Sequence, residues 1–420
     1  MGEATVTTRK KPRPFSIGTA LQRRLVYLGI DVPLLVVSII LVIFGLLMVY
    51  SASTDYSLLI YGTPNRIFMR QVQVLLISLV LATVMFFLDY HILRIVALPG
   101  MGATILMLVL VLFVSDERHG AIRTIWEGSV QPSELAKLMV VVYLSVWLFS
   151  KRDKLRDIGF GLVPLGGILG ILGGLIIIQP DISAVLTIFF VGGMMFFLAG
   201  GELKQIAILI LLAAFFGFFI VIFTDTGRQR FGSFLPGFFD PLAAPYHVQR
   251  SLEAFYKGGW LGVGIGMADT KYTGLPVPPT DSIFAVVGEE TGFFGAFFLV
   301  IMYVILLWRG LSIARRAPDE LGTLMAAGLS FWIVMESLIN MAVMVNLLPF
   351  AGNALPFISA GGSNLLVSLM AVGILLNISR LASRVKGEDV FVFSSVVDLR
   401  WRNRRRRVSR PRRISGFDGT

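Results

Sequence analysis

Ten long apolar stretches constrain this chain more than any other feature of its sequence. Each is long enough to cross a bilayer as a helix, which takes about 20 residues. The chain is 55% hydrophobic and 15% charged over 420 residues, too apolar for a soluble protein of this length. We therefore predict an all-α integral membrane protein with about ten transmembrane helices. They lie near residues 33–50, 71–88, 95–114, 134–150, 159–178, 183–199, 205–224, 283–308, 321–348 and 362–379.

Basic residues predict the orientation of these helices. Most of the 37 Lys and Arg residues fall in the two tails and in alternate short loops such as 151–157. Cytoplasmic segments carry such an excess, so both termini are expected in the cytoplasm. The expected organisation is a basic tail (1–31), a membrane domain (32–384) and an Arg-rich tail (385–420). The net charge of +11 then indicates orientation and contact with anionic lipid, and not nucleic-acid binding.

One long connection, about residues 225–282, falls outside, between the seventh and eighth stretches. It mixes aromatic, basic and Gly-rich segments, and connections of this length usually carry function. We predict short amphipathic or re-entrant pieces there, with aromatic rings at headgroup depth.

Cysteine and histidine chemistry is largely excluded. The chain has no cysteine, which rules out disulfides, thiolate metal sites and cysteine nucleophiles. Its three histidines, His91, His119 and His247, are scattered and none lies in an HExxH pattern. Zinc chemistry is therefore not expected.

The segment GLPVPPTDSIFAVVGEETG, residues 274–292, places three carboxylates at the start of the eighth stretch. Asp281 lies where the external connection meets the helix, so one explanation is a helix N-cap. A capped carboxylate is also well oriented, which leaves a chemical role open. Glu289 and Glu290 lie about 12 Å further along the helix. Like Glu336 in the ninth stretch, they must face a polar cavity, find a partner or be protonated.

Two further polar motifs lie at the ends of apolar stretches. In VQPSELAK (130–137), Glu134 and Lys137 are spaced i, i+3 and can pair on one helix face. In ALPFISAGGSN (354–364), a proline and a glycine pair disfavour helix, and such backbone near a membrane must be covered. We predict one external, partly hydrated cavity, with scattered caps and loop charges as the alternative. Its expected residues are Arg123, Glu134, Lys137, Asp181 and Asp281.

Together these motifs resemble the SEDS family (shape, elongation, division and sporulation), typified by FtsW and RodA. MVYSAS, QPSELAK, QPDIS, PPTDSIFAVVGEETGFFGA and LPFISAGGSN each look like a family signature, and the likeness covers about residues 30–385. It implies a peptidoglycan glycosyltransferase that polymerises lipid II at the outer face of the bacterial cytoplasmic membrane. It also implies a partner, a class B penicillin-binding protein that cross-links the product.

The resemblance assigns roles to the site residues. Asp281 corresponds to the catalytic aspartate and would take the proton of the attacking sugar hydroxyl. Arg123 and Lys137 are candidates to steady the donor pyrophosphate. Mg²⁺ could bind there too. No ligand spacing requires it, so we predict no metal site and leave Mg²⁺ as the one optional cofactor. The remaining assignments are substrate binding by Arg123, Glu134, Lys137, Asp181 and Ser363, and buried polar support by Glu289, Glu290 and Glu336.

The chain also departs from the family pattern. His247 and Arg250 stand where glutamines are usual, and Ala360 and Asn364 replace a tyrosine and a serine. These changes fall on the substrate side and not on the expected base. The ALPFIS segment favours the division-type FtsW branch over the elongation-type RodA branch.

Two other function classes are also compatible with the sequence. A flippase for a lipid-linked sugar would use intramembrane glutamates for proton or substrate passage, although no internal repeat typical of carriers is visible. A non-catalytic scaffold would position the penicillin-binding protein. Asp281 separates them from the polymerase, which should fail when this residue becomes Asn.

Overall fold

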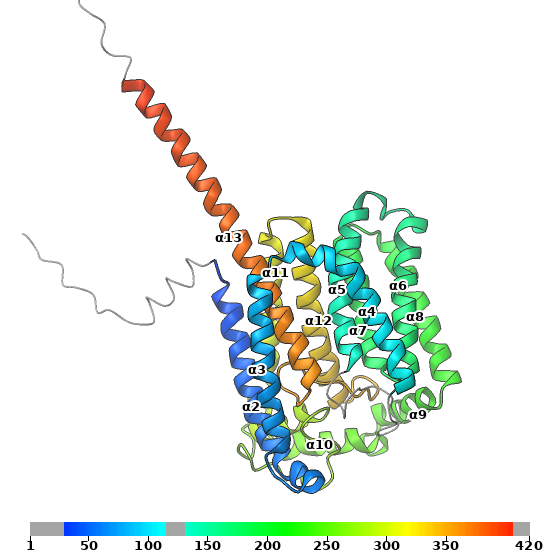
Figure 1. Cartoon of the computed structure of the whole chain (residues 1–420). Coiled ribbons are helices and arrows are strands. Elements are labelled where there is room, and N and C mark those ends of the chain that lie inside the picture. The colour runs from blue at the N-terminus through cyan, green and yellow to red at the C-terminus, as the bar shows by residue number, and fades with distance from the viewer. Residues whose placement is uncertain (1–28, 115–130, 406–420) are drawn as a thin grey trace, which may run out of the picture.

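A computed structural model describes residues 29–114 and 131–405. Within these ranges every regular element is a helix (Figure 1), so the all-α prediction is confirmed. The long helices are α2 (Val32–Tyr61), α3 (Arg66–Phe87), α4 (Leu93–Val114), α5 (Pro132–Lys151), α6 (Val163–Ile178), α7 (Ile182–Leu198), α8 (Leu203–Phe223), α9 (Asp225–Phe239), α10 (Tyr246–Gly258), α11 (Ile283–Arg316), α12 (Glu320–Met344) and α13 (Gly362–Arg405). Short turns of helix are η1 (Tyr90–Ile92), η2 (Arg152–Lys154), η3 (Ile158–Leu162) and η4 (Pro241–Ala243).

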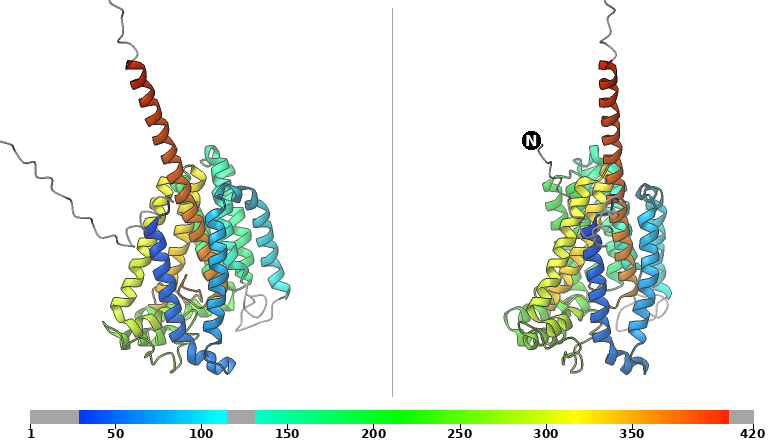
Figure 2. Two further views of the ribbon diagram at one scale, coloured as in Figure 1. Left: turned by 60° about the vertical axis from the view of Figure 1, so that its left-hand side comes forward. Right: turned by 90° about the vertical axis from the view of Figure 1, so that its left-hand side faces the viewer.

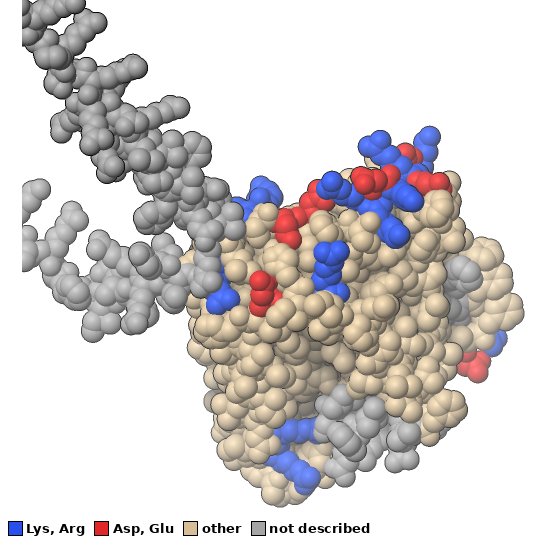
Figure 3. Space-filling view, turned by 45° about the horizontal axis from the view of Figure 1, so that its top comes forward, with Lys and Arg blue, Asp and Glu red and all other residues tan. Residues whose placement is uncertain are grey.

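Nine helices of the described ranges are long and apolar enough to cross a membrane, and α7 is a shorter apolar helix. These ten coincide with the ten predicted stretches. They form one upright bundle and run alternately between its two ends (Figures 1 and 2). We call the end that carries residues 225–282 the loop end, and the end where the chain enters α2 the tail end. Charged side chains gather on the tail end, above a flank that is almost free of charge (Figure 3).

The connection between α8 and α11 crosses the loop end. It contains α9, η4 and α10, which lie across the bundle below its long helices (Figures 1 and 2). The residues of α10 that are buried, Val248, Ser251, Ala254 and Gly258, are spaced three or four apart and so share one face. The predicted amphipathic pieces are therefore present as short helices.

The last helix is longer than the sequence predicted. α13 does not end near residue 384 but continues as helix to Arg405, projecting away from the bundle (Figure 1). No proline interrupts the chain before Pro411, so nothing covalent stops the helix at the end of the membrane domain. The first part of the expected C-terminal tail is thus helical.

The chain enters the bundle at a buried carboxylate. Asp31 caps α2 by accepting a hydrogen bond from the backbone N–H of Leu34 (3.1 Å). Its two oxygens also accept from Arg309 Nε (3.0 Å) and Nη2 (2.6 Å). Arg316 Nη2 donates to the same carboxylate (2.8 Å). Asp31 therefore ties the start of α2 to the last turns of α11.

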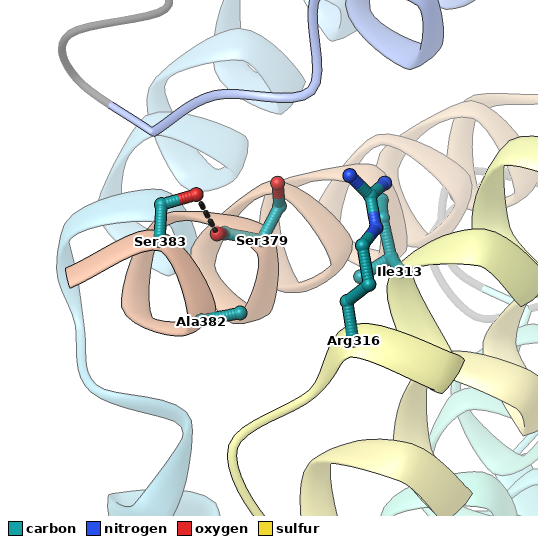
Figure 4. A pocket seen from close by; sticks show the side chains of 5 residues that line it. All are labelled: Ile313, Arg316, Ser379, Ala382 and Ser383. Atoms are coloured by element: carbon teal, nitrogen blue, oxygen red, sulfur yellow. Dashed lines mark hydrogen bonds between the residues drawn. The ribbon is translucent and has the colours of Figure 1, made fainter. Parts of the chain in front are cut away.

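A small pocket adjoins this carboxylate, between α11 and α13 (Figure 4). Arg316 lines it from α11, and Ser379 and Ser383 line it from α13. Ser379 Oγ donates to the backbone carbonyl of Gly29 (3.2 Å), and Ser383 Oγ lies between that carbonyl (3.3 Å) and the carbonyl of Ser379 (3.1 Å). The three helices α2, α11 and α13 are thus joined at the tail end.

Replacing Asp31 with Asn should lower the free energy of unfolding by about 2 kcal/mol, because two arginines lose a shared, buried carboxylate. Burial alone raises the pKa of Asp31. The hydrogen bonds from Arg309 and the Leu34 N–H, with the arginine charges, outweigh it and hold this pKa below its usual value. The Asp31 carboxylate therefore stabilises the fold at pH values above its pKa in the unfolded chain. This stabilisation is lost as the pH falls through its pKa in the folded protein.

The measurement is the melting temperature against pH. Between about pH 5 and pH 3 the wild type should lose more stability than Asp31→Asn. Asp153→Asn, whose side chain is 92% exposed, is the control and should melt like the wild type. Equal melting temperatures for Asp31→Asn and the wild type at neutral pH would contradict the prediction.

Candidate active site

The starts of three helices meet at the loop end. Asp181 caps α7 by accepting from the backbone N–H of Ala184 (3.3 Å). Its Oδ2 accepts from Ser133 Oγ (2.9 Å) and from Gln131 Nε2 (3.1 Å) at the start of α5. The backbone N–H of Gln131 donates to Ser363 Oγ (2.9 Å) at the start of α13. Gln131 thus links Asp181 to Ser363, and the contact of these two residues with substrate stays a prediction.

A buried charge network lies just inside this junction. Lys137 Nζ donates to Glu134 Oε1 (2.9 Å) and to Glu336 Oε1 (2.5 Å). Asn364 Nδ2 donates to Glu134 Oε2 (3.0 Å) and Glu336 Oε1 (2.8 Å), and Trp332 Nε1 donates to Glu336 Oε2 (2.8 Å). None of these residues is more than 6% exposed. Two carboxylates thus share one ammonium, and neutral N–H groups satisfy the remaining oxygens, as burial of charge requires.

The i, i+3 pairing of Glu134 with Lys137 is confirmed. The structure adds that Glu336 completes the pair and that Asn364, one of the departures from the family pattern, bonds to both carboxylates. Sequence reasoning missed Asn364 and Trp332 here, because nothing local indicates that α12 and α13 face α5. The charges of Glu134 and Lys137 are directed at each other, so their contact with substrate stays a prediction.

Asp281 lies just before α11, and the N-cap position of that helix is Ser282, not Thr280 or Asp281. The carboxylate is half-buried against the connection between α12 and α13. A methyl group on Gly352 would lie 2.6 Å from Asp281 Oδ2. In the same connection, Ser359 Oγ donates to the carbonyl of Thr280 (2.7 Å). The ALPFIS segment therefore packs against the backbone at Thr280. Its residues 355–359 are buried, so this non-helical chain is covered by protein, as expected near a membrane.

His247 of α10 contacts Ser282, the residue that follows this aspartate. Its Nε2 is 2.6 Å from Ser282 Oγ, which also lies 2.5 Å from the carbonyl of Pro276. A serine hydroxyl has one proton, and the carbonyl can only accept. Nε2 therefore carries a proton and donates to Ser282. Burial lowers the pKa of His247 to about 4, so the ring is neutral at pH 7.

This histidine should make stability depend on pH. Its pKa is about 4 in the fold against an ordinary 6.5, so the unfolded chain takes the proton first as pH falls. The contribution of the neutral ring is complete above about pH 6.5 and is lost progressively toward pH 4, on the order of 2 kcal/mol by pH 5. His247→Gln keeps an N–H donor without a titrating group. Its melting temperature should vary less between pH 7 and pH 5 than that of the wild type, and an identical pH dependence would refute this role.

The helix α11 breaks at Gly292, where φ is 65° and ψ is −168°. The backbone carbonyls of Glu289 and Glu290 therefore lack their usual helical partners. They accept instead from the N–H groups of Val263 and Gly264, both at 3.0 Å. Part of the connection that precedes α11 is thus fixed in the break.

The side chains of the two glutamates hold the same connection. Glu289 accepts from the backbone N–H (3.3 Å) and the hydroxyl of Thr270. Glu290 Oε1 accepts from Lys271 Nζ (2.9 Å) and from Ser51 Oγ (2.5 Å) on α2. Both glutamates are at most 1% exposed. The sequence left three possibilities for these glutamates: a polar cavity, a partner or protonation. The structure shows that both have partners.

Arg123 lies outside the described residues. Among the described ones, no three His, Cys, Asp or Glu side chains are close enough to hold a metal ion together. Mg²⁺ and the role of Arg123 stay predictions.

A family model for the cell cycle proteins FtsW, RodA and SpoVE matches residues 32–384. The chain belongs to this family. The resemblance noted in the sequence is thereby confirmed. The fold brings its QPSELAK, QPDIS and TDSIFA motifs to one end of the bundle.

Curated relatives place the chain within the FtsW/RodA/SpoVE family. A probable peptidoglycan glycosyltransferase FtsW of Trichlorobacter lovleyi is 37% identical over 353 residues, 83% of this chain and 93% of the relative. Stage V sporulation protein E of Bacillus subtilis is 35% identical over 358 residues, 83% of this chain and 97% of the relative. These names support the FtsW branch.

Solved structures share the fold. One, described as showing structural coordination of polymerization and crosslinking by a peptidoglycan synthase complex, superposes with a TM-score of 0.69 at 26% identity, covering 84% of this chain and 98% of that one. The rod shape determining protein RodA of Thermus thermophilus superposes with a TM-score of 0.62 at 25% identity, covering 84% and 97%. The chain is therefore a multi-pass membrane protein of the same architecture.

Proposed function

We propose that this family member is a peptidoglycan glycosyltransferase of cell division that polymerises lipid II, with Asp281 as the general base. The observation that carries the proposal is the position of Asp281. Its half-buried carboxylate lies at the loop end, beside the junction of α5, α7 and α13 where the family motifs meet. The names of the relatives support the activity, since several are probable peptidoglycan glycosyltransferases.

The chemistry suits a single positioned carboxylate. The 4-hydroxyl of the acceptor sugar forms a bond to the anomeric carbon of the donor, while the bond from that carbon to undecaprenyl pyrophosphate breaks. Asp281 accepts the hydroxyl proton, because a hydroxyl is otherwise a weak nucleophile. By analogy with other sugar chemistry, the transition state has oxocarbenium character. Arg123 is the candidate to stabilise the leaving pyrophosphate, with Mg²⁺ as an optional aid.

The loop end is then the outer face of the bacterial cytoplasmic membrane, and the tail end faces the cytoplasm. The basic residues of the tails and of the tail-end loops support this orientation. The partner is a class B penicillin-binding protein that cross-links the glycan. The similarity to a peptidoglycan synthase complex in which polymerization and crosslinking are coordinated supports such a partner.

The test is glycan synthesis from lipid II by the purified protein with its cognate transpeptidase, followed by gel separation of the strands. We expect strands that require the family member in addition to the transpeptidase. A preparation that binds the transpeptidase but makes no strands would favour the scaffold. Transfer of lipid II between leaflets of a vesicle without strand formation would favour the flippase.

A further inference from the structure

Two buried asparagines connect Asp281 to the charge network. Asn340 of α12 is fully buried, and its Nδ2 donates to the backbone carbonyls of Asp281 (3.1 Å) and Asn353 (2.6 Å). Asn353, in the connection between α12 and α13, donates from its own Nδ2 to the carbonyl of Glu336 (3.1 Å). The backbone carbonyl of Asp281 is thus linked through the side chains of Asn340 and Asn353 to the backbone of Glu336. Glu336 is one of the two carboxylates that bind Lys137.

The orientation of both amides is determined by their partners. The NH₂ group of each asparagine faces at least one backbone carbonyl, which can only accept a hydrogen bond. Flipping either amide would therefore bring its oxygen against a carbonyl oxygen. The Oδ1 atoms of Asn340 and Asn353 are buried and have no hydrogen-bond partner within the described residues. Buried polar atoms of this kind are uncommon and need an explanation. Their donors satisfy three backbone carbonyls, those of Asp281, Asn353 and Glu336.

Gly352, the residue before Asn353, bears on the position of the Asp281 carboxylate. A methyl group on Gly352 would lie 2.6 Å from Asp281 Oδ2, closer than such atoms pack. The backbone at Gly352 is not in the left-handed region, so its lack of a side chain is needed for space and not for conformation. Asn340 therefore holds the backbone of Asp281, and Gly352 leaves room for its carboxylate.

We propose that Asn340, with Asn353 and Gly352, is the positioning device that aims the Asp281 carboxylate. The inference rests on the proposed role of Asp281 as base. A displacement of about 1 Å in a catalytic group can cost about 10²-fold in rate. These residues act through Asp281 and do not touch the substrate themselves.

The first test is Asn340→Asp, which removes the NH₂ group without changing the size of the side chain. The matched control is Asn346→Asp. Asn346 is also buried and also donates from Nδ2 to a backbone carbonyl, that of Gly237 (2.7 Å), but it lies against α9. We expect Asn340→Asp in complex with the transpeptidase to lose about 10²-fold in kcat with KM for lipid II within about twofold. Asn346→Asp should keep the wild-type kcat.

A second pair of variants avoids the core of the protein. Gly352→Ala should move the carboxylate and lower kcat about 10²-fold. In the same connection, Gly361→Ala adds a methyl group at 3.4 Å from the nearest atom, an ordinary contact, and should stay active. If Asn340→Asp fails to fold, this pair decides the question. A rise in KM at unchanged kcat, or equal kcat for Gly352→Ala and Gly361→Ala, would overturn the inference.

Asp281→Asn in the same assay separates the two proposals. If it is inactive while Asn340→Asp and Gly352→Ala match their controls, the positioning device is wrong and the base assignment stands. If Asp281→Asn keeps the wild-type kcat, the base assignment itself is wrong, and the positioning role has no group to act upon.

Discussion

Replacing Asp281 with Asn is expected to lower the kcat of glycan polymerisation by about 10²- to 10⁴-fold, the usual contribution of a positioned base. Asn has nearly the same size and keeps an oxygen toward the substrate, but it cannot take the proton of the attacking hydroxyl. KM should change little, because the substrate is bound mainly by other groups. The measurement is initial-rate polymerisation of lipid II by the protein in complex with its transpeptidase.

The matched control for this loss is Asp225→Asn. Asp225 lies on the same side of the bundle, and its side chain is 99% exposed. This variant should polymerise like the wild type. Asp281→Asn should still bind the transpeptidase, because Asp281 does not cap α11 and the start of that helix stays intact. Undiminished strand formation by Asp281→Asn would send the search for a base elsewhere.

Replacing Lys137 with Met should lower the free energy of unfolding by about 3–5 kcal/mol, because Glu134 and Glu336 then remain buried without a cation. Met matches the length of the lysine stem, so the loss of charge dominates over any cavity. A change of this size is a large share of the stability of an ordinary domain. The melting temperature of the purified variant measures it.

Two variants check that the cause is uncompensated charge. Adding Glu134→Gln to Lys137→Met removes one of the stranded carboxylates and should recover part of the lost stability, which a packing defect would not. Lys257→Met removes a lysine whose pairs with Glu253 and Asp269 are partly exposed, and it should change little. A double variant no more stable than Lys137→Met would argue against the charge explanation.

Much of the fold was predictable because lipid leaves few options for the chain. Every apolar stretch became a helix, since a spanning segment must satisfy its backbone within itself. The pairing of Glu134 with Lys137 was also predictable, because helical spacing places residues three apart on one face. The extent of α13 was not, since hydropathy marks where lipid ends and not where a helix ends.

The partners of the buried charges could not be read along the chain. Glu336 bonds to Lys137 of α5 and Asn364 of α13, and this depends on which helices are neighbours. Glu289 and Glu290 were expected deep in a helix, where they would face a polar cavity, find a partner or be protonated. The break at Gly292 admits the connection between α8 and α11, and Thr270 and Lys271 bond to the two glutamates.

By itself, the sequence determined an all-α membrane protein of this family, with Asp281 as its expected base. These follow from local properties: the length of apolar stretches, the sign of loop charges and the motifs themselves. Only the tertiary structure decided that Asn340 and Gly352 adjoin Asp281 and that Asn364 bridges two glutamates. The physical reason is that hydropathy acts within one helix, whereas the position of a catalytic group depends on hydrogen bonds and close contacts between helices far apart in sequence.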